Sequence, residues 1–99
     1  MAEEKTTEIQ VTHRIPLSLE GVKSALPAAL MYLARGERPQ AIPEGQPKGM
    51  RFALTDKSIG YIDKLLPEFG SRTQVITHAL AWVAERSEQQ IFMLKNTKV

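Results

Sequence analysis

The sequence predicts a mainly α-helical chain with a short β ribbon, arranged as a dimer with an N-terminal strand-helix extension. Residues 50–54 alternate apolar with other side chains, as a strand with one buried face does. Two segments with helical spacing follow, separated by a short turn. This strand-helix-helix stretch is too short to bury a sufficient core alone, and the chain has no cysteine for a disulfide staple. We therefore expect two copies to pair.

The strand has two chemically different faces. Met50, Phe52 and Leu54 share one parity and predict the buried face, while Arg51 and Ala53 share the other. Because side chains alternate along a strand, Arg51 and Ala53 are expected on the opposite, accessible face.

Capping residues mark both helices. Thr55 is expected to accept a free N–H at the start of the first helix, and Pro67 and Gly70 to bound its end. Ser71 and Gln74 form the pattern of a capping box at the start of the second helix. The expected apolar positions of the two helices are Ile59, Ile62, Leu65, Leu66, Val75, Ile76, Ala79, Leu80, Trp82 and Val83.

The N-terminal part contains a second strand candidate. Residues 9–15 alternate and are ended by Pro16. Gln10, Thr12 and Arg14 form their polar face, which predicts either a second nucleic-acid surface or an edge strand packed on the domain.

Two readings of the next segment stay open. Either one helix begins after Ser18 and kinks near Pro27, or a helix runs from about Ala25 to Arg35 with Ser24 as its cap. Neither reading gives a second capped helix, so the sequence predicts no internal repeat.

The C-terminal end also has two readings. The helix that begins at Ser71 runs on to about Lys95, or the apolar residues 91–94 fold back as a short strand. In both cases we expect these residues to cover the N-terminal helix or a partner chain. The predicted organisation is a flexible tail at 1–8, a strand-helix unit at 9–36, a Pro/Gly linker at 37–48 and the main domain at 49–95.

The order of strand, capped helix, glycine turn and capped helix over residues 48–86 resembles the ribbon-helix-helix DNA-binding family of the Arc, MetJ and CopG type. The resemblance implies that two chains pair their strands into an antiparallel ribbon that enters the DNA major groove. It also implies that the second helix forms the dimer core and that its N-terminus holds a phosphate. The implied dimer core comprises Phe52, Leu54, Ile76, Leu80 and Val83.

The resemblance places the base contacts on the outer face of the strand. An arginine can offer paired donors to guanine, so Arg51 is the predicted base reader, and Ala53 can touch a thymine methyl. This ribbon face is poorer in polar side chains than is usual in the family. The predicted phosphate contacts are Lys48, Ser71, Arg72 and Thr73.

Other classes of function have little support in the sequence. His13 and His78 are far apart and lack an acidic partner at metal spacing, so we expect no metal or cofactor. No nucleophile set or phosphate-binding glycine loop predicts an enzyme. The net charge of +2 is a weak footprint for a nucleic-acid binder. No apolar run is long enough to span a bilayer and no signal peptide pattern opens the chain, which predicts a cytoplasmic protein.

The sequence thus predicts a homodimeric regulator that binds double-stranded DNA, repressing a promoter or organising a plasmid or phage site. The first alternative is a protein-interaction module, like an antitoxin or an inhibitor. In that case the ribbon-helix-helix part only dimerises, and residues 9–36 and 91–94 bind a partner protein. The second alternative is a monomer with a helix-turn-helix, whose recognition helix begins at Ser71.

Overall fold

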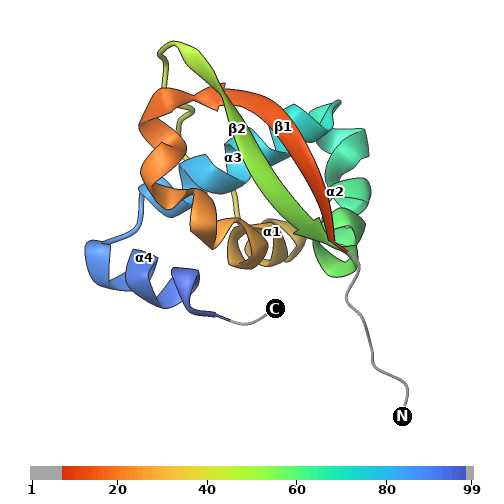
Figure 1. Ribbon diagram of the computed structural model, residues 1–99. Coiled ribbons are helices and arrows are strands. Elements are labelled where there is room, and N and C mark those ends of the chain that lie inside the picture. Colours follow the sequence, from red (N-terminus) through yellow and green to blue (C-terminus); the bar gives the residue numbers. More distant parts are fainter. Residues whose placement is uncertain (1–7, 98–99) are drawn as a thin grey trace.

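The computed structural model describes residues 8–97 and has the order strand-helix-helix twice, followed by one more helix (Figure 1). The predicted tail at 1–8 therefore lies outside the described residues, except for Glu8. The elements are β1 (Glu8–Pro16), the 3₁₀ helix η1 (Leu17–Ala25), α1 (Leu26–Ala34), β2 (Pro47–Thr55), α2 (Asp56–Phe69), α3 (Arg72–Ala84) and α4 (Glu88–Lys95).

The two strands form an antiparallel ribbon within one chain. The register runs from Glu8 opposite Thr55 to Pro16 opposite Pro47. The expectation that residues 50–54 pair with the same stretch of a second copy is thus corrected, because β1 takes that place. β1 has the same length and the same alternation as β2, and because both belong to one chain, joined by residues 17–46, β1 is held at a high local concentration.

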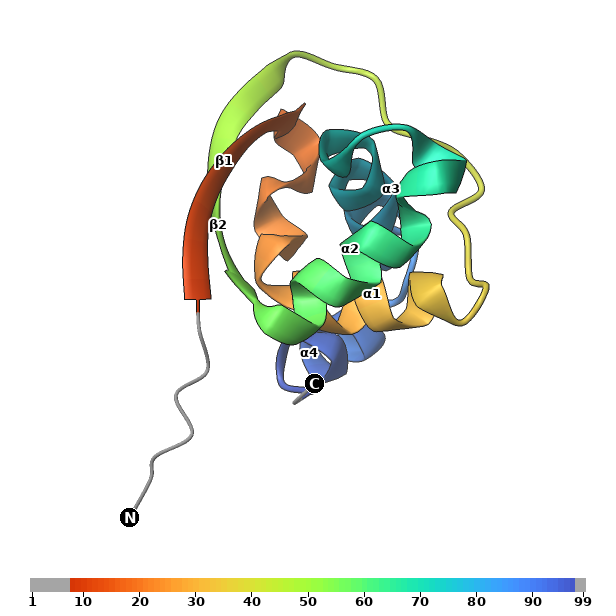
Figure 2. The same cartoon turned by 90° about the vertical axis from the view of Figure 1, so that its right-hand side faces the viewer.

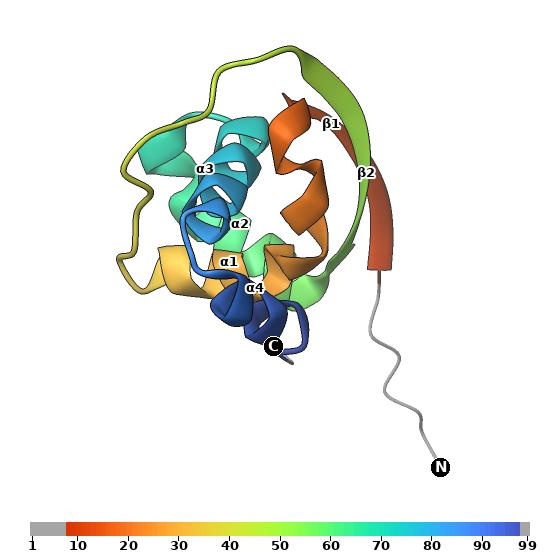
Figure 3. The same cartoon turned by 90° about the vertical axis from the view of Figure 1, so that its left-hand side faces the viewer.

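The ribbon covers one side of the helices, as the two side views show (Figures 2 and 3). Its inner face buries Ile15 from β1 and Met50, Phe52 and Leu54 from β2. Behind it, α1 and α3 pack against each other and both contact α2. The molecule therefore has two layers, and the outer face of the ribbon is free of any covering element in the described chain.

The residues predicted to form a dimer core lie in the core of a single chain. Each is at most 4% exposed, and η1 and α1 supply many of the apolar side chains around them. The predicted N-terminal unit thus fills the place that the sequence assigned to a second copy. The residues in question are Phe52, Leu54, Ile76, Leu80 and Val83.

Most helix starts and stops follow the capping chemistry. Thr55 Oγ1 accepts the N–H of Ser58, and Ser71 Oγ accepts the N–H of Gln74. Gly70 ends α2 in the left-handed region, with φ at 90°. Proline at residue 67 does not bound this helix, because it lies inside the last turn.

The N-terminal helix is divided differently from both readings of the sequence. A 3₁₀ helix fills residues 17–25, and α1 begins only at Leu26. Ala25, not Ser24, is the N-cap, and it provides no side-chain hydrogen bond. Pro27 does lie in the first turn, as expected, where its missing N–H costs nothing.

Both readings of the C-terminal end are wrong, because α3 ends at Ala84 and a separate helix begins at Glu88. A reciprocal capping box between Ser87 and Gln90 starts this helix, α4. α4 packs against η1 and α1 as expected, but of its four apolar residues it buries Leu94 and partly buries Ile91, while Phe92 and Met93 stay exposed.

The connection between α1 and β2 is attached to the helices at two points. Arg38 Nε donates to Glu68 Oε2 over 2.8 Å, and a second Arg38 nitrogen pairs with the other carboxylate oxygen. The N–H groups of Gln40 and Ala41 both donate to Glu85 Oε2. The predicted linker therefore runs along the molecule, and the units it was expected to separate share one core.

Candidate nucleic-acid interface

The central part of the outer face of the ribbon gathers six exposed residues, three from each strand. Alternation places every second residue of β1 and β2 away from the helices. The register puts Gln10 opposite Ala53, Thr12 opposite Arg51 and Arg14 opposite Gly49. These six comprise two arginines, two polar side chains and two small residues, and Glu8, exposed at the end of the same face opposite Thr55, adds one acidic group.

Arg51 and Ala53 lie where the alternation predicted, on the exposed side of β2. Their contact with bases stays a prediction. Sequence reasoning missed that Gln10, Thr12 and Arg14 belong to the same face as these two. The sequence does contain a signal for this pairing, because both strands alternate and each is followed directly by a helix.

The two arginines of this face are open to a ligand. Among the described residues, neither Arg14 nor Arg51 takes part in an ion pair. The backbone carbonyl of Arg51 accepts a hydrogen bond from Lys23 Nζ over 3.3 Å, which leaves the guanidinium free. Lys23 thereby brings a third cation to the edge of the ribbon, from η1.

One flank of the ribbon is the N-terminus of α3. Ser71, Arg72 and Thr73, the predicted phosphate contacts, lie together there. Thr73 Oγ1 lies 2.7 Å from His13 Nδ1 on β1, so a hydrogen bond joins the helix start to the strand. Arg72 is half exposed, with Asp63 at 3.6 Å. The helix start and its cation are accessible beside β1.

The surroundings of His13 disfavour its charged form. Partial burial lowers the pKa of His13, and the nearby Arg72 guanidinium lowers it further. A neutral imidazole can share one proton with the Thr73 hydroxyl. Neutral His13 is therefore the form that suits the junction between β1 and α3.

The other flank lies beside β2 and the junction of η1 with α1. A hollow of about 210 Å³ there is lined in part by Lys23, Ser24 and Pro27, together with Arg51 and Ala53. The N-terminus of α1 thus borders one edge of the ribbon, as that of α3 borders the other. Each flank thus has a helix start and a basic side chain beside the ribbon.

Lys48, the fourth predicted phosphate contact, has a partner in the fold. Its Nζ lies 2.9 Å from Glu20 Oε2 on η1, and both side chains are about half exposed. This pair reduces the free charge at that end of the ribbon. The phosphate contact of Lys48 stays a prediction, with a competing carboxylate in place.

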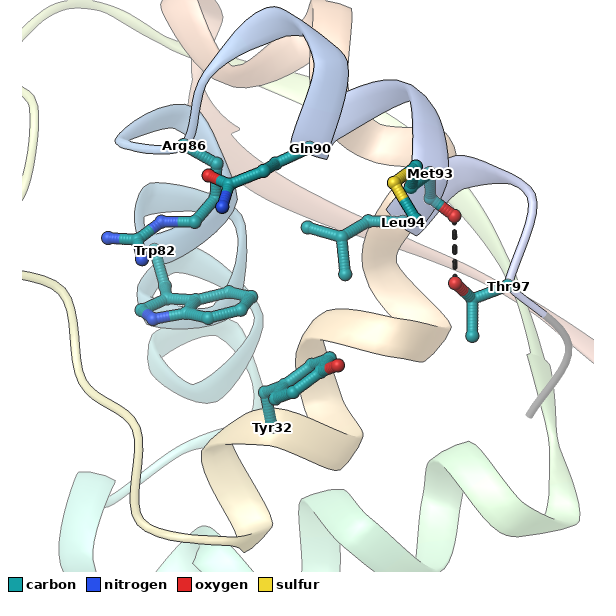
Figure 4. A pocket seen from close by; sticks show the side chains of 7 residues that line it. All are labelled: Tyr32, Trp82, Arg86, Gln90, Met93, Leu94 and Thr97. Carbon is teal, nitrogen blue, oxygen red and sulfur yellow. Dashed lines mark hydrogen bonds between the residues drawn. The ribbon is translucent and has the colours of Figure 1, made fainter.

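A second concave site lies between α1, α3 and α4, on a different part of the molecule (Figure 4). The rings of Tyr32 and Trp82 stack with centroids 5.0 Å apart, and the Arg86 guanidinium lies 4.8 Å from the Trp82 ring centroid. Arg86 Nε is buried without a hydrogen-bond partner in the described residues. The pocket of about 340 Å³ is lined by these aromatic rings together with Arg86, Met93 and Leu94, which suits an apolar group.

The part of the chain that the structure describes holds neither a metal-binding cluster nor a membrane-spanning helix. Within residues 8–97, no three His, Cys, Asp or Glu side chains are grouped so that they could hold a metal ion. Over the same residues, no helix has the length and apolar character needed to cross a bilayer. His78 instead hydrogen-bonds the Gln74 carbonyl over 2.8 Å, and its ring packs on Phe69.

Fold and site together define a two-layer protein that exposes a two-stranded ribbon with a basic and polar outer face. Comparison with protein-family models, curated proteins and solved structures found no match to this chain.

Proposed function

We propose that the protein binds double-stranded DNA by placing the β1–β2 ribbon in the major groove, as a repressor or a plasmid or phage site-binding regulator. The observation that carries this proposal is the outer face of the ribbon, with Arg14, Arg51, Gln10 and Thr12 exposed together. The major groove admits a two-stranded ribbon, and these side-chain types offer the donors and acceptors that base edges require.

The flanks of the ribbon support the same function. A ribbon in the groove has a phosphate backbone on each side, and backbone contacts fix the register of a DNA-binding protein. The start of α3 with Arg72 faces one side, and Lys23 beside the start of α1 faces the other. The free N–H groups at the start of α3 suit a phosphate, whereas beside the start of α1 the cation is the group that suits one, because the Leu26 N–H is bonded to Lys23 O and Pro27 has no N–H.

The proposed binding unit is one chain, because β1 and β2 complete the ribbon within it. A dimer joined through residues 50–54 does not fit this ribbon, because β1 already pairs with that stretch. An association of two chains would use another surface, and the mass of the protein in solution tests for it.

The test begins with a selection of duplexes from a random pool by the full chain. The affinity for the selected duplex is then measured against salt concentration, because phosphate contacts make affinity fall as salt rises. Arg51→Ala is expected to lower specific affinity by about 5- to 150-fold, the range for a lost bidentate contact to guanine. Arg51→Lys keeps the charge but not the paired donors, so it is expected to lose base discrimination while the salt dependence stays.

Arg35→Ala is the matched control. Arg35 is an exposed arginine at the C-cap of α1, the end of that helix that lies away from the ribbon (Figure 2). Its loss changes the net charge equally but removes no group from the outer face. If Arg51→Ala and Arg35→Ala have the same small effect on specific affinity, the ribbon is not the reader.

Protein binding is a second candidate function, favoured by one observation on α4. Phe92 is 68% exposed and Met93 is 62% exposed, and Met93 lines the pocket at Trp82 and Arg86. We propose that a partner protein would place an apolar side chain there. Capture from the host with and without nuclease separates this function from DNA binding, since partners held only through DNA are lost after nuclease treatment.

A further inference from the structure

The ribbon is made of two strands with different sequences, so its two halves present different chemistry. About the central pair of Thr12 and Arg51, a rotation that exchanges β1 with β2 carries Gln10 onto the position of Gly49, and Arg14 onto that of Ala53. In a ribbon built from two copies of one strand, such positions hold the same residue, and the DNA site mirrors that symmetry. In this ribbon none of the equivalent positions holds the same residue in both strands.

The outer face consequently changes along its length. Arg14 lies beside Gly49 toward one end, Arg51 beside Thr12 in the middle, and Gln10 beside Ala53 toward the other end, where Glu8 opposite Thr55 closes the ribbon. Residues two apart in a strand are separated by about 6.7 Å, and successive base pairs by about 3.4 Å. Neighbouring pairs of the ribbon therefore meet base pairs about two steps apart.

The side chains along the face match two different kinds of base pair. Arginine pairs with O6 and N7 of guanine, glutamine pairs with N6 and N7 of adenine, and an alanine methyl contacts the thymine methyl. Arg14 and Arg51 thus favour G·C pairs at one end and in the middle. Gln10 and Ala53, which lie directly opposite each other, favour an A·T pair at the other end, where one reads adenine and the other its thymine partner.

We infer that one chain recognises a non-palindromic duplex, with G·C pairs under Arg14 and Arg51 and an A·T pair under Gln10 and Ala53. This inference rests on the proposed function, and it adds the symmetry of the site, the number of chains bound and the order of the base pairs. The small side chain of Ala53 and the absence of one at Gly49 leave the longer side chains beside them room to reach the groove floor.

The test is the symmetry of the duplexes that the full chain selects, together with the stoichiometry of the complex. We expect one motif without two-fold symmetry and one chain per duplex by native mass spectrometry. Gln10→Ala is expected to remove the preference at the A·T end only, and Arg14→Lys the preference at the opposite G·C end only. Each change should reduce discrimination at its own position by about 5- to 150-fold.

Because Gln10 and Arg14 are both exposed, thermal unfolding of the variants checks that the fold is unchanged. A palindromic motif occupied by two chains overturns the inference and leaves DNA binding in place. Duplex binding without an enriched motif overturns it in the same way. A chain that binds no duplex at low salt overturns the proposed function itself, so the two failures are distinguishable.

Discussion

Truncation of Ile15 to alanine tests whether β1 belongs to the core of the same chain. Ile15 is 0% exposed on the inner face of β1, and its side chain joins the cluster formed with β2 and the helices. Removal of buried methyl groups at such a site costs about 2–5 kcal/mol, because the cavity closes only in part. A chain of this size has a total stability of about 5–15 kcal/mol, so the change is a large fraction.

Urea unfolding followed by circular dichroism measures the effect. A loss of about 3 kcal/mol lowers the midpoint by roughly 1–3 M at the urea dependence usual for small domains. Ile9→Ala is the matched control, since Ile9 lies on the same strand and is 38% exposed. The control is expected to lower the free energy of unfolding by less than about 1 kcal/mol, because the Ile9 side chain loses less buried apolar surface when it is truncated.

The reasoning is refuted if both variants cost the same small amount, because β1 would then be a loosely attached arm. A second measurement addresses the partner of β2 directly. For a ribbon within one chain, the midpoint stays constant when the protein concentration changes about a hundredfold, whereas a ribbon between two copies gains stability with concentration. A concentration-dependent midpoint would restore the dimer that the sequence first predicted.

The remaining predictions concern single side chains. Gly70→Ala is expected to lower the free energy of unfolding by about 1 kcal/mol, because residue 70 has a φ of 90°. Gly60→Ala, inside α2 with free space around it, should instead raise the free energy of unfolding by about 0.5–1 kcal/mol. Urea midpoints compare the two variants, and shifts of the same sign would contradict the assigned turn. The lowered pKa of His13 means that the unfolded chain binds its proton more readily, so stability is full above the ordinary pKa of 6.5 and falls as pH drops through that value toward the folded pKa. His13→Gln should reduce the difference between the urea midpoints at neutral and at mildly acidic pH. If this difference is the same in the variant and the parent protein, the burial of His13 does not contribute to the pH dependence of stability.

The sequence was sufficient to predict local structure wherever a side chain acts on its own backbone. Thr55 and Ser71 cap helices as expected, because hydroxyl acceptance of a nearby N–H depends only on neighbouring residues. Alternation likewise located Arg51 and Ala53 on the exposed side of their strand. The same local logic would have found the start of α4, since Ser87 and Gln90 have the spacing of a capping box.

The sequence was not sufficient to predict which strand pairs with which. Alternation fixes the face that a residue occupies, but two strands with the same alternation are equally good partners for a third. Sequence reasoning paired residues 50–54 with a second copy because the strand-helix-helix stretch was too short to fold alone, and because residues 9–36 showed no second capped helix. Gly21, Ser24 and Pro27 do prevent an ordinary helix there, and the chain forms the 3₁₀ helix η1 in that place. The repeat of strand, helix and helix is therefore real in space but faint in sequence.

Pairing within one chain also changes what the outer face can carry. In a ribbon of two identical strands, every arginine appears twice, and like charges directly opposite one another destabilise the pair. Here Arg51 lies opposite Thr12, and Arg14 lies opposite Gly49, so each cation has a neutral neighbour across the ribbon. The two different strands pair directly within one chain, so the ribbon needs no second copy. Because each strand has its own sequence, one half of the face can change without the other, and this independence is the physical basis for an asymmetric DNA site.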